Sequence, residues 1–114
     1  MAQAYVLPPL TDETLAEIVR RIAAVGSPER IILFGSRARG DDGPDSDLDL
    51  LIVEESDLPR YRRAARYYRA LTGTFPAKDI VVWTPDEIDS WREVRYAFIT
   101  TAVREGRTLY ERPR

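Results

Sequence analysis

Apolar side chains recur every three or four positions over residues 12–25, and this spacing predicts an amphipathic helix. The apolar positions are Leu15, Ile18, Val19, Ile22 and Val25. Thr11 or Asp12 can cap the start of this helix, since both side chains accept hydrogen bonds from free backbone N–H groups. Gly26 and Pro28 then end it.

The pattern next changes to short, β-rich apolar runs, each of which predicts a buried strand. These runs cover residues 31–34, 47–53 and 80–83, and a last short strand is predicted at 108–110. Turn-forming residues follow the first run, so the chain changes direction between the first two strands.

Helices are predicted between these strands. Residues 37–40 predict one short helical turn, and residues 58–72 predict a helix that ends near Gly73. From Pro85 one long helix is predicted, which Gly106 caps, because apolar residues continue at helical spacing. These residues are Ile88, Trp91, Val94, Phe98 and Ala102, and we interpret Trp91, Val94 and Phe98 as core positions.

This order of elements favours an α/β or α+β fold, in which helices flank a small mixed β-sheet. The length of 114 residues predicts a single domain, residues 1–114. Residues 1–10 include two adjacent prolines and predict an extended N-terminal arm.

Composition narrows the chemistry that such a domain can perform. With 17 basic and 19 acidic residues the net charge is −2, so no general attraction to nucleic acid or membranes is expected. The apolar runs are far too short for a membrane span, and no signal peptide is evident, so a cytoplasmic location is predicted. The chain has no cysteine and no histidine, which excludes His/Cys zinc sites and Ser-His or Cys nucleophiles. A bound metal would need oxygen ligands, which favours Mg²⁺, Mn²⁺ or Ca²⁺.

The first candidate for chemistry is the segment after the first strand, GSRARG. Gly35 allows a backbone to approach a phosphate closely, and the N–H groups at the start of the short helix can donate to it. Ser36 adds a hydroxyl, and Arg37 and Arg39 add guanidinium groups that match phosphate geometry. An ordinary turn is the alternative. The segment lacks the Gly-Lys-Ser/Thr of a Walker A loop and the GxGxxG of a dinucleotide site.

The second candidate is the pair Asp47 and Asp49 at the start of the second strand. Alternate side chains of a strand point to the same face, so these two carboxylates point one way, and Leu48, Leu50 and Ile52 point the other way, into the core. Two adjacent carboxylates suit a hard divalent cation. A calcium EF-hand beginning at Asp45 is excluded, since Leu50 and Ser56 replace its required Gly and Glu. Asp41, Asp42 and Asp45 are interpreted as solvated turn residues.

Asp79 is the third candidate, an acid at the head of the third strand. If the second and third strands are neighbours, Asp47, Asp49 and Asp79 could meet at one edge of the sheet, as in two-metal phosphoryl transfer. The alternative is a surface acid at a strand end, and spacing alone does not decide between them.

Together, GSRARG, SDLDLLIV and a later acid before a strand resemble the nucleotidyltransferase superfamily related to DNA polymerase β, and in particular its minimal (MNT-type) members. The resemblance covers about residues 30–111, including the closing REGRTLYE. It implies a small mixed sheet with flanking helices, Mg²⁺ and a nucleoside triphosphate, usually ATP. No position of the motif is missing.

Carried over to these positions, the resemblance implies a role for each candidate residue. Gly35, Ser36 and Arg39 would bind the triphosphate, and Asp47 and Asp49 would hold the metals. Asp79 would be a ligand of the catalytic metal and the base toward the acceptor hydroxyl. Whether one or two metals bind stays open.

The resemblance also suggests an acceptor and a partner. Many MNT-type proteins are antitoxins paired with a HEPN-type ribonuclease toxin, which implies transfer of AMP from ATP to a toxin tyrosine. Beyond the predicted sheet and its helices we expect no domain that clamps an acceptor. The acceptor site is therefore expected to be shallow, or to be completed by a partner or a second protomer. A non-catalytic antitoxin that masks its partner and a small-molecule (aminoglycoside-like) nucleotidyltransferase are the alternatives.

Residues 60–69 interleave five arginines with three tyrosines. Such a segment can bind RNA or an acidic partner. We favour a solvated helix face whose arginines lie over apolar neighbours, and a protein interface is the better functional alternative to nucleic acid. Trp83 shares a strand face with Asp79, and core packing is its favoured role.

Overall fold

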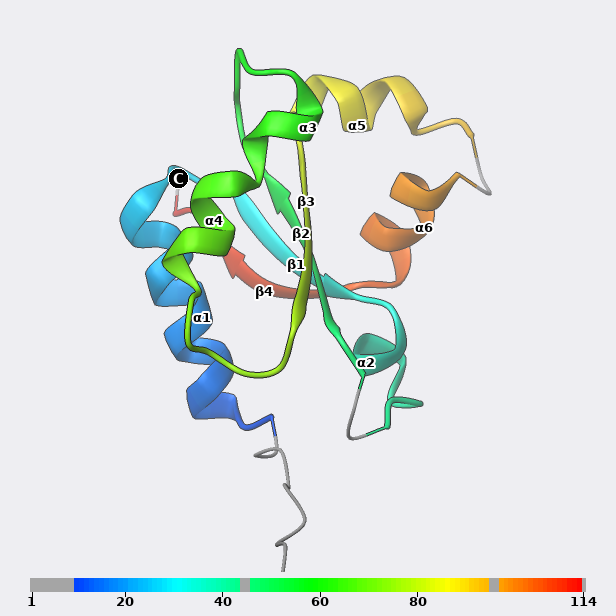
Figure 1. The fold of residues 1–114 in the computed structure, drawn as a ribbon. Coiled ribbons are helices and arrows are strands. Elements are labelled where there is room, and N and C mark those ends of the chain that lie inside the picture. Colours follow the sequence, from blue (N-terminus) through cyan, green and yellow to red (C-terminus); the bar gives the residue numbers. More distant parts are fainter. Residues whose placement is uncertain (1–9, 44–45, 95–96, 114) are drawn as a thin grey trace, which may run out of the picture.

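A four-stranded mixed sheet forms the centre of the computed structural model, which describes residues 10–43, 46–94 and 97–113 (Figure 1). The strand order is β3-β2-β1-β4. The strands are β1 (Arg30–Phe34), β2 (Leu48–Val53), β3 (Lys78–Trp83) and β4 (Arg107–Glu111). Strand β1 runs antiparallel to β2 and β4, whereas β2 and β3 are parallel. The predicted mixed sheet is confirmed, and residues 1–9 of the predicted arm lie outside the described residues.

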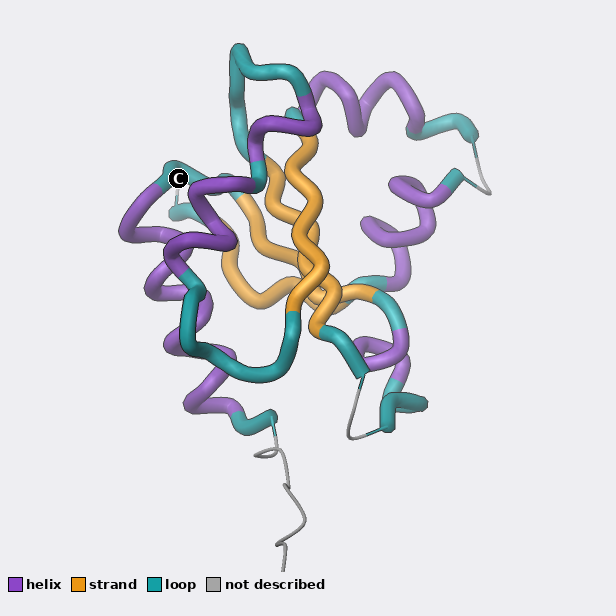
Figure 2. Tube along the Cα trace, viewed as in Figure 1, coloured by secondary structure: helices purple, strands orange, loops and turns teal. Residues whose placement is uncertain are grey.

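Helices cover both faces of this sheet (Figure 2). They are α1 (Asp12–Val25), α2 (Ser36–Arg39), α3 (Arg60–Arg63), α4 (Ala65–Ala70), α5 (Pro85–Trp91) and α6 (Phe98–Glu105). One face packs against α1 and α4, and the other packs against α5 and α6. Each face therefore has its own layer of core side chains.

Alternation along β2 divides its side chains between these two cores. Leu48, Leu50 and Ile52 are fully buried on the face that packs against α1 and α4. Leu51 and Val53 contribute to the other core, together with Ile99 of α6. Asp49 is in register with the odd-numbered side chains, and so it lies at the end of the face that α5 and α6 cover.

Helix α1 confirms the prediction for residues 12–25. The side chain of Thr11 accepts a hydrogen bond from the backbone N–H of Thr14, and the backbone N–H of Gly26 donates to Ile22. Of the two capping residues considered, Thr11 is thus the one used. Ile18 and Ile22 are fully buried against the sheet, so the amphipathic pattern reflects burial of one face.

The single long helix predicted from Pro85 to Gly106 is wrong. The chain leaves the helix at Trp91, and α6 begins at Phe98. Thr84 and Glu87 start α5 with reciprocal capping hydrogen bonds, and the backbone N–H of Val94 closes a turn onto Trp91. A straight continuation would not bring Ile99 and Ala102 onto the sheet, where both are buried.

The core positions predicted for Trp91, Val94 and Phe98 are also wrong. Their relative exposures are 43%, 46% and 50%. These side chains lie on either side of the break between α5 and α6, so they do not share the continuous helical face that their spacing suggested. Gly106 does cap α6, because its backbone N–H donates to the carbonyl of Ala102.

The helix predicted for residues 58–72 is divided into α3 and α4 at Ala64. Two of its side chains cover the outer edge of β3. The Tyr68 hydroxyl accepts from the backbone N–H of Ile80 at 2.8 Å, and the Arg63 guanidinium donates to the carbonyl of Val82 at 3.2 Å. These contacts satisfy backbone groups that an edge strand otherwise leaves open.

Candidate active site

Gly35 connects β1 to α2 in a backbone conformation that other residues rarely adopt, with φ of 75°. Its carbonyl accepts hydrogen bonds from the backbone N–H groups of Ala38 and Arg39, both at 3.1 Å. A Cβ atom at this position would overlap the carboxylate of Asp49. Glycine is therefore required twice here, by the turn and by the close approach of a carboxylate.

Asp49 and Asp79 are direct register partners on the parallel strands β2 and β3. Their side chains consequently point to the same face of the sheet. Asp49 also pairs with Phe34 of β1, and Asp47 immediately precedes β2. The condition that the second and third strands are neighbours is thus met, and the three acids belong to one end of the sheet.

Asp49 is in an unfavourable environment for a negative charge. Burial raises the pKa of its carboxyl above the usual range, and the nearby carboxylates of Asp79 and Asp47 raise it further. The Arg39 guanidinium acts in the opposite direction and lowers this pKa. A positive charge placed among these acids would relieve the repulsion.

The three carboxylates have no competing partners in the described part of the chain, where Asp47, Asp49 and Asp79 make no side-chain hydrogen bond or ion pair. Their oxygens suit a hard divalent cation such as Mg²⁺. The described residues hold no group of three or more acids already placed as a metal site. The oxygen donors and the mutual repulsion of these carboxylates fit a divalent cation. The three side chains would take up their ligand positions when the cation binds.

The segment after Gly35 separates the two arginines that the sequence grouped together. Arg37 has a side-chain exposure of 9%, and it donates to the carbonyl of Ser46 at 2.9 Å and to Asp42 at 3.3 Å. Arg39 is half exposed and pairs with Asp41 at 3.2 Å. Arg37 therefore holds the loop, whereas Arg39 remains able to contact a ligand.

The interpretation of the neighbouring aspartates as solvated turn residues holds for Asp41 and Asp42, which are exposed. Each also forms an ion pair with an arginine of α2. Asp45 lies outside the described residues. The Ser36 hydroxyl makes no hydrogen bond among the residues that the structure describes, so it is available to a ligand.

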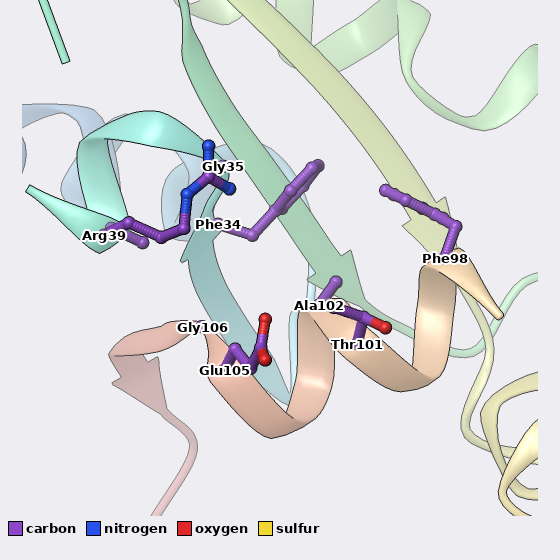
Figure 3. A pocket seen from close by; sticks show the side chains of 9 residues that line it. Phe34, Gly35, Arg39, Phe98, Thr101, Ala102, Glu105 and Gly106 are labelled. Atoms are coloured by element: carbon purple, nitrogen blue, oxygen red, sulfur yellow. The ribbon is translucent and has the colours of Figure 1, made fainter. Parts of the chain in front are cut away.

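A pocket of about 340 Å³ opens beside Gly35, between α2 and α6 (Figure 3). Its lining comprises Phe34, Gly35, Ala38, Arg39, Phe98, Thr101, Ala102, Glu105 and Gly106. Figure 3 shows Phe34 and Arg39 on one side, and Phe98, Thr101 and Glu105 of α6 on the other. Sequence reasoning missed these α6 residues, although Phe98, Thr101 and Glu105 have the spacing of a single helical face.

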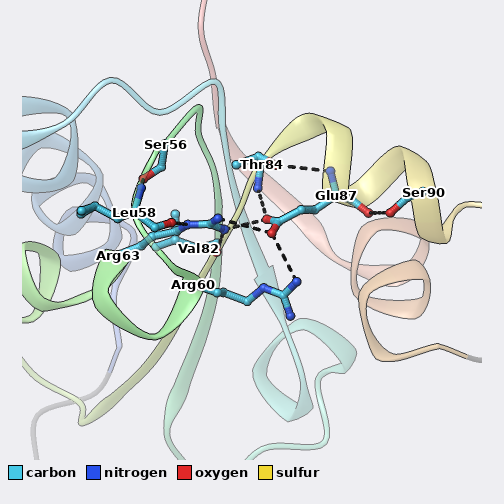
Figure 4. A network of polar contacts seen from close by, with 8 residues as sticks. All are labelled: Ser56, Leu58, Arg60, Arg63, Val82, Thr84, Glu87 and Ser90. Atoms are coloured by element: carbon cyan, nitrogen blue, oxygen red, sulfur yellow. Dashed lines mark hydrogen bonds and ion pairs between the residues drawn. The ribbon is translucent and has the colours of Figure 1, made fainter.

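Three arginines of residues 60–69 have structural partners. Arg60 lies over the Trp83 ring at 3.8 Å, and Arg66 binds Glu54. Figure 4 shows Arg63 bound to Glu87. Trp83 is buried, as predicted. The favoured interpretation fits Arg60 and Arg66, whose half-exposed side chains lie over the rings of Trp83 and Tyr67. It is wrong for Arg63, which is buried and bound to Glu87.

The surface of this segment keeps other exposed groups. Tyr61 has 85% of its surface exposed, and Arg62 and Arg69 are exposed without an ion pair among the described residues. These three side chains are available for contact with another molecule.

The chain belongs to the nucleotidyltransferase domain family, whose model matches residues 13–104. It has the polymerase β-like form of that domain, an α+β fold with a mixed four-stranded sheet. No curated protein matches it, and no helix in the described ranges has the length and apolar character needed to cross a membrane.

Two solved structures are similar to the chain. A putative nucleotidyltransferase from Sulfolobus solfataricus is 27% identical, with a TM-score of 0.60 over 86% of this chain and 78% of that chain. A toxin-antitoxin structure with AMP-PNP is 19% identical, with a TM-score of 0.61 over 86% of this chain and 73% of the other. At that identity the second likeness concerns the fold.

Proposed function

We propose that this chain is a Mg²⁺-dependent nucleotidyltransferase that moves AMP from ATP to a protein hydroxyl, a tyrosine of a HEPN-type ribonuclease toxin, and thereby acts as an antitoxin. The observation that carries the proposal is the pairing of Asp49 with Asp79 across neighbouring strands, with Gly35 close to the Asp49 carboxylate at the same end of the sheet. Family membership supports the reaction class, and the toxin-antitoxin structure with AMP-PNP supports the choice of nucleotide and partner.

In the proposed reaction the acceptor oxygen attacks the α-phosphorus of ATP, and the bond between the α- and β-phosphates breaks. Pyrophosphate leaves, and Asp79 accepts the proton of the acceptor hydroxyl. Mg²⁺, held by Asp47, Asp49 and Asp79, would supply charge neutralisation for the phosphates. This role would account for three carboxylates without protein partners at one end of the sheet.

Gly35, Ser36 and Arg39 bind the triphosphate in this proposal. The backbone at Gly35 can approach a phosphate because no Cβ is present, and the hydroxyl of Ser36 is free to donate. Arg39 lowers the pKa of Asp49 and so lies close enough to act on the same charge centre. Its guanidinium can bind a phosphate by two parallel hydrogen bonds.

The proposal is tested with α-labelled ATP, Mg²⁺ and the HEPN-type toxin. The double variant Asp47→Asn, Asp49→Asn should transfer no label, because it keeps the shape of both side chains and removes both charges. Asp89→Asn, an exposed acid on α5, is the matched control and should transfer label normally. Undiminished labelling by the double variant would refute the mechanism.

A second function, neutralisation by binding alone, is favoured by one observation, the exposed group formed by Tyr61, Arg62 and Arg69. Such a surface can mask a partner without chemistry. The same double variant separates the two functions in cells. Loss of toxin neutralisation supports transfer, whereas full neutralisation supports masking.

A further inference from the structure

We infer that the pocket between α2 and α6 binds the nucleobase of the nucleotide and that Glu105 selects a base with an amino group, which favours adenine over a 6-oxopurine. This inference rests on the proposed function for the identity of the ligand. It concerns residues of α6, a helix that contains none of the three acids Asp47, Asp49 and Asp79. Three features support it: the position of the pocket, its aromatic walls and the charge at its rim.

The position of the pocket connects it to the proposed phosphate site. Gly35 and Arg39 line it and also belong to the segment assigned to the triphosphate. Phe34, which lines the pocket, is the register partner of Asp49. A nucleotide whose phosphates lie between Arg39 and the acids therefore has this pocket beside it. The volume of about 340 Å³ is at the lower end of the range for small-ligand sites.

Two aromatic side chains give the pocket the character of a base site. The rings of Phe34 and Phe98 meet edge to face, with centroids 5.3 Å apart and an interplanar angle of 74°. Phe98 is half exposed, so part of its ring has no protein contact. Ala38 and Ala102 leave room beside these rings, because a larger side chain at either position would fill the space. A planar base gains by stacking against such a ring.

Glu105 supplies the polar contact. Its carboxylate is exposed at the pocket, and its ion pair in the described residues is a long one of 3.7 Å to Arg104. An ionised carboxylate only accepts hydrogen bonds. It can therefore bind the exocyclic amino group of adenine, whereas the carbonyl oxygen of a 6-oxopurine would be repelled. Thr101, one turn earlier on the same face of α6, can either donate or accept.

The test is a calorimetric measurement of ATP, ITP and inorganic tripolyphosphate binding in the presence of Mg²⁺. Phe98→Ala should weaken ATP binding about tenfold and leave tripolyphosphate binding unchanged, because only ATP has a base to stack. Phe98→Leu keeps an apolar contact to Phe34 and should also weaken ATP. Trp91→Ala removes an aromatic ring of similar exposure outside the pocket, and should change neither affinity.

Glu105→Gln should reduce the preference for ATP over ITP by about tenfold, since an amide can donate to the 6-oxo group. Glu111→Gln, an exposed acid on β4 that does not line this pocket, is its control. Equal weakening of ATP and tripolyphosphate binding by Phe98→Ala would overturn the inference. Normal ATP binding by Phe98→Ala together with loss of AMP transfer would also overturn it, because the pocket would then hold the acceptor. Selective ATP binding by a wild-type chain that transfers no AMP would leave the base pocket standing and refute the proposed reaction.

Discussion

Strand β2 has an acid near each end, Asp49 and Glu54, and the surroundings of the two carboxylates are opposite in character. At the far end Glu54 is buried, and its carboxylate accepts from Arg66 at 2.6 Å, Tyr67 at 2.7 Å and the backbone of Ser27 at 2.6 Å. At the near end burial raises the pKa of Asp49, and the like charges of Asp79 and Asp47 raise it further. The fold satisfies the Glu54 carboxylate fully and leaves that of Asp49 unsatisfied, and this difference supports the proposal that the near end binds a ligand.

Glu87 extends the contrast. The hydrogen bond from Arg63 lowers the pKa of its carboxyl to about 2, and the Thr84 backbone and Arg60 act in the same direction. The carboxylates of Glu54 and Glu87 are thus stabilised by arginines of α3 and α4. Near Asp49 the chain provides Arg39, which lowers the pKa of Asp49 by less than burial and Asp79 together raise it.

The largest expected effect comes from Asp79→Asn, which removes one charge from the unsatisfied end. Transfer of labelled AMP should fall by about a thousandfold, because the variant loses both a cation ligand and the proposed base. The free energy of unfolding in urea should stay the same or rise slightly, since a repulsive charge is removed. A variant that loses stability together with activity would show that Asp79 has a structural role.

A substitution of Glu54, at the satisfied end of β2, should have the opposite effect: it should lower stability and leave ATP binding unchanged. Glu54→Ala leaves the buried Tyr67 hydroxyl and the Ser27 N–H without their acceptor, so the free energy of unfolding should fall by about 3 kcal/mol. ATP binding by the folded fraction should be unchanged. Urea denaturation gives the first quantity and calorimetry below the transition gives the second. Little loss of stability would show that the network contributes less than its geometry suggests.

Two glycines with positive φ allow a comparison at the site. Gly35 and Gly40 have φ of 75° and 81° but ψ of −158° and 11°, so Gly40 is left-handed helical, whereas Gly35 lies in a region essentially limited to glycine. Of the two, only Gly35 has a group that a Cβ would meet, the Asp49 carboxylate. Gly40→Ala should cost about 1 kcal/mol through backbone strain. Gly35→Ala should cost about 2 kcal/mol, because its backbone region excludes alanine more strongly and Asp49 must move. It should also weaken nucleotide binding, which Gly40→Ala should leave unchanged. Equal effects of the two substitutions on stability and binding would contradict a role for the close approach.

The smallest effect concerns acid stability. The pKa of Glu87 is about 2 in the folded chain, below its usual value of 4.5, so its contribution is complete above about pH 4.5 and is lost as the pH falls toward 2. Glu87→Gln should remove this part of the pH dependence and lower the free energy of unfolding at neutral pH by about 1–2 kcal/mol. Urea denaturation of both chains between pH 2 and 7 measures it, and parallel curves would contradict the assignment.

Local patterns predicted the elements whose causes are local. Helix α1 and the four strands follow from side-chain spacing and from capping residues within a few positions. The break between α5 and α6 was missed because Val94 continues the helical spacing, and only packing of Ile99 and Ala102 on the sheet shows that the chain turns.

The candidate site divides in the same way. The acids and Gly35 were evident from residue type and position, but the pairing of Asp49 with Asp79 depends on strand register, which no local pattern contains. The roles of Arg63 and Arg66 depend on Glu87 and Glu54, which are 24 and 12 positions away. The pocket at α6 depends on the packing of helices far apart in sequence, so residues such as Glu105 could not be chosen beforehand.

The covering of the β3 edge by Arg63 and Tyr68 has a consequence during synthesis of the chain. Both residues precede β3 in sequence, so they leave the ribosome before the strand that they cover. When β3 emerges, the groups that satisfy the outer edge of Ile80 and Val82 are already available. The order of the chain therefore shortens the time in which a nascent edge strand could pair with a neighbouring polypeptide.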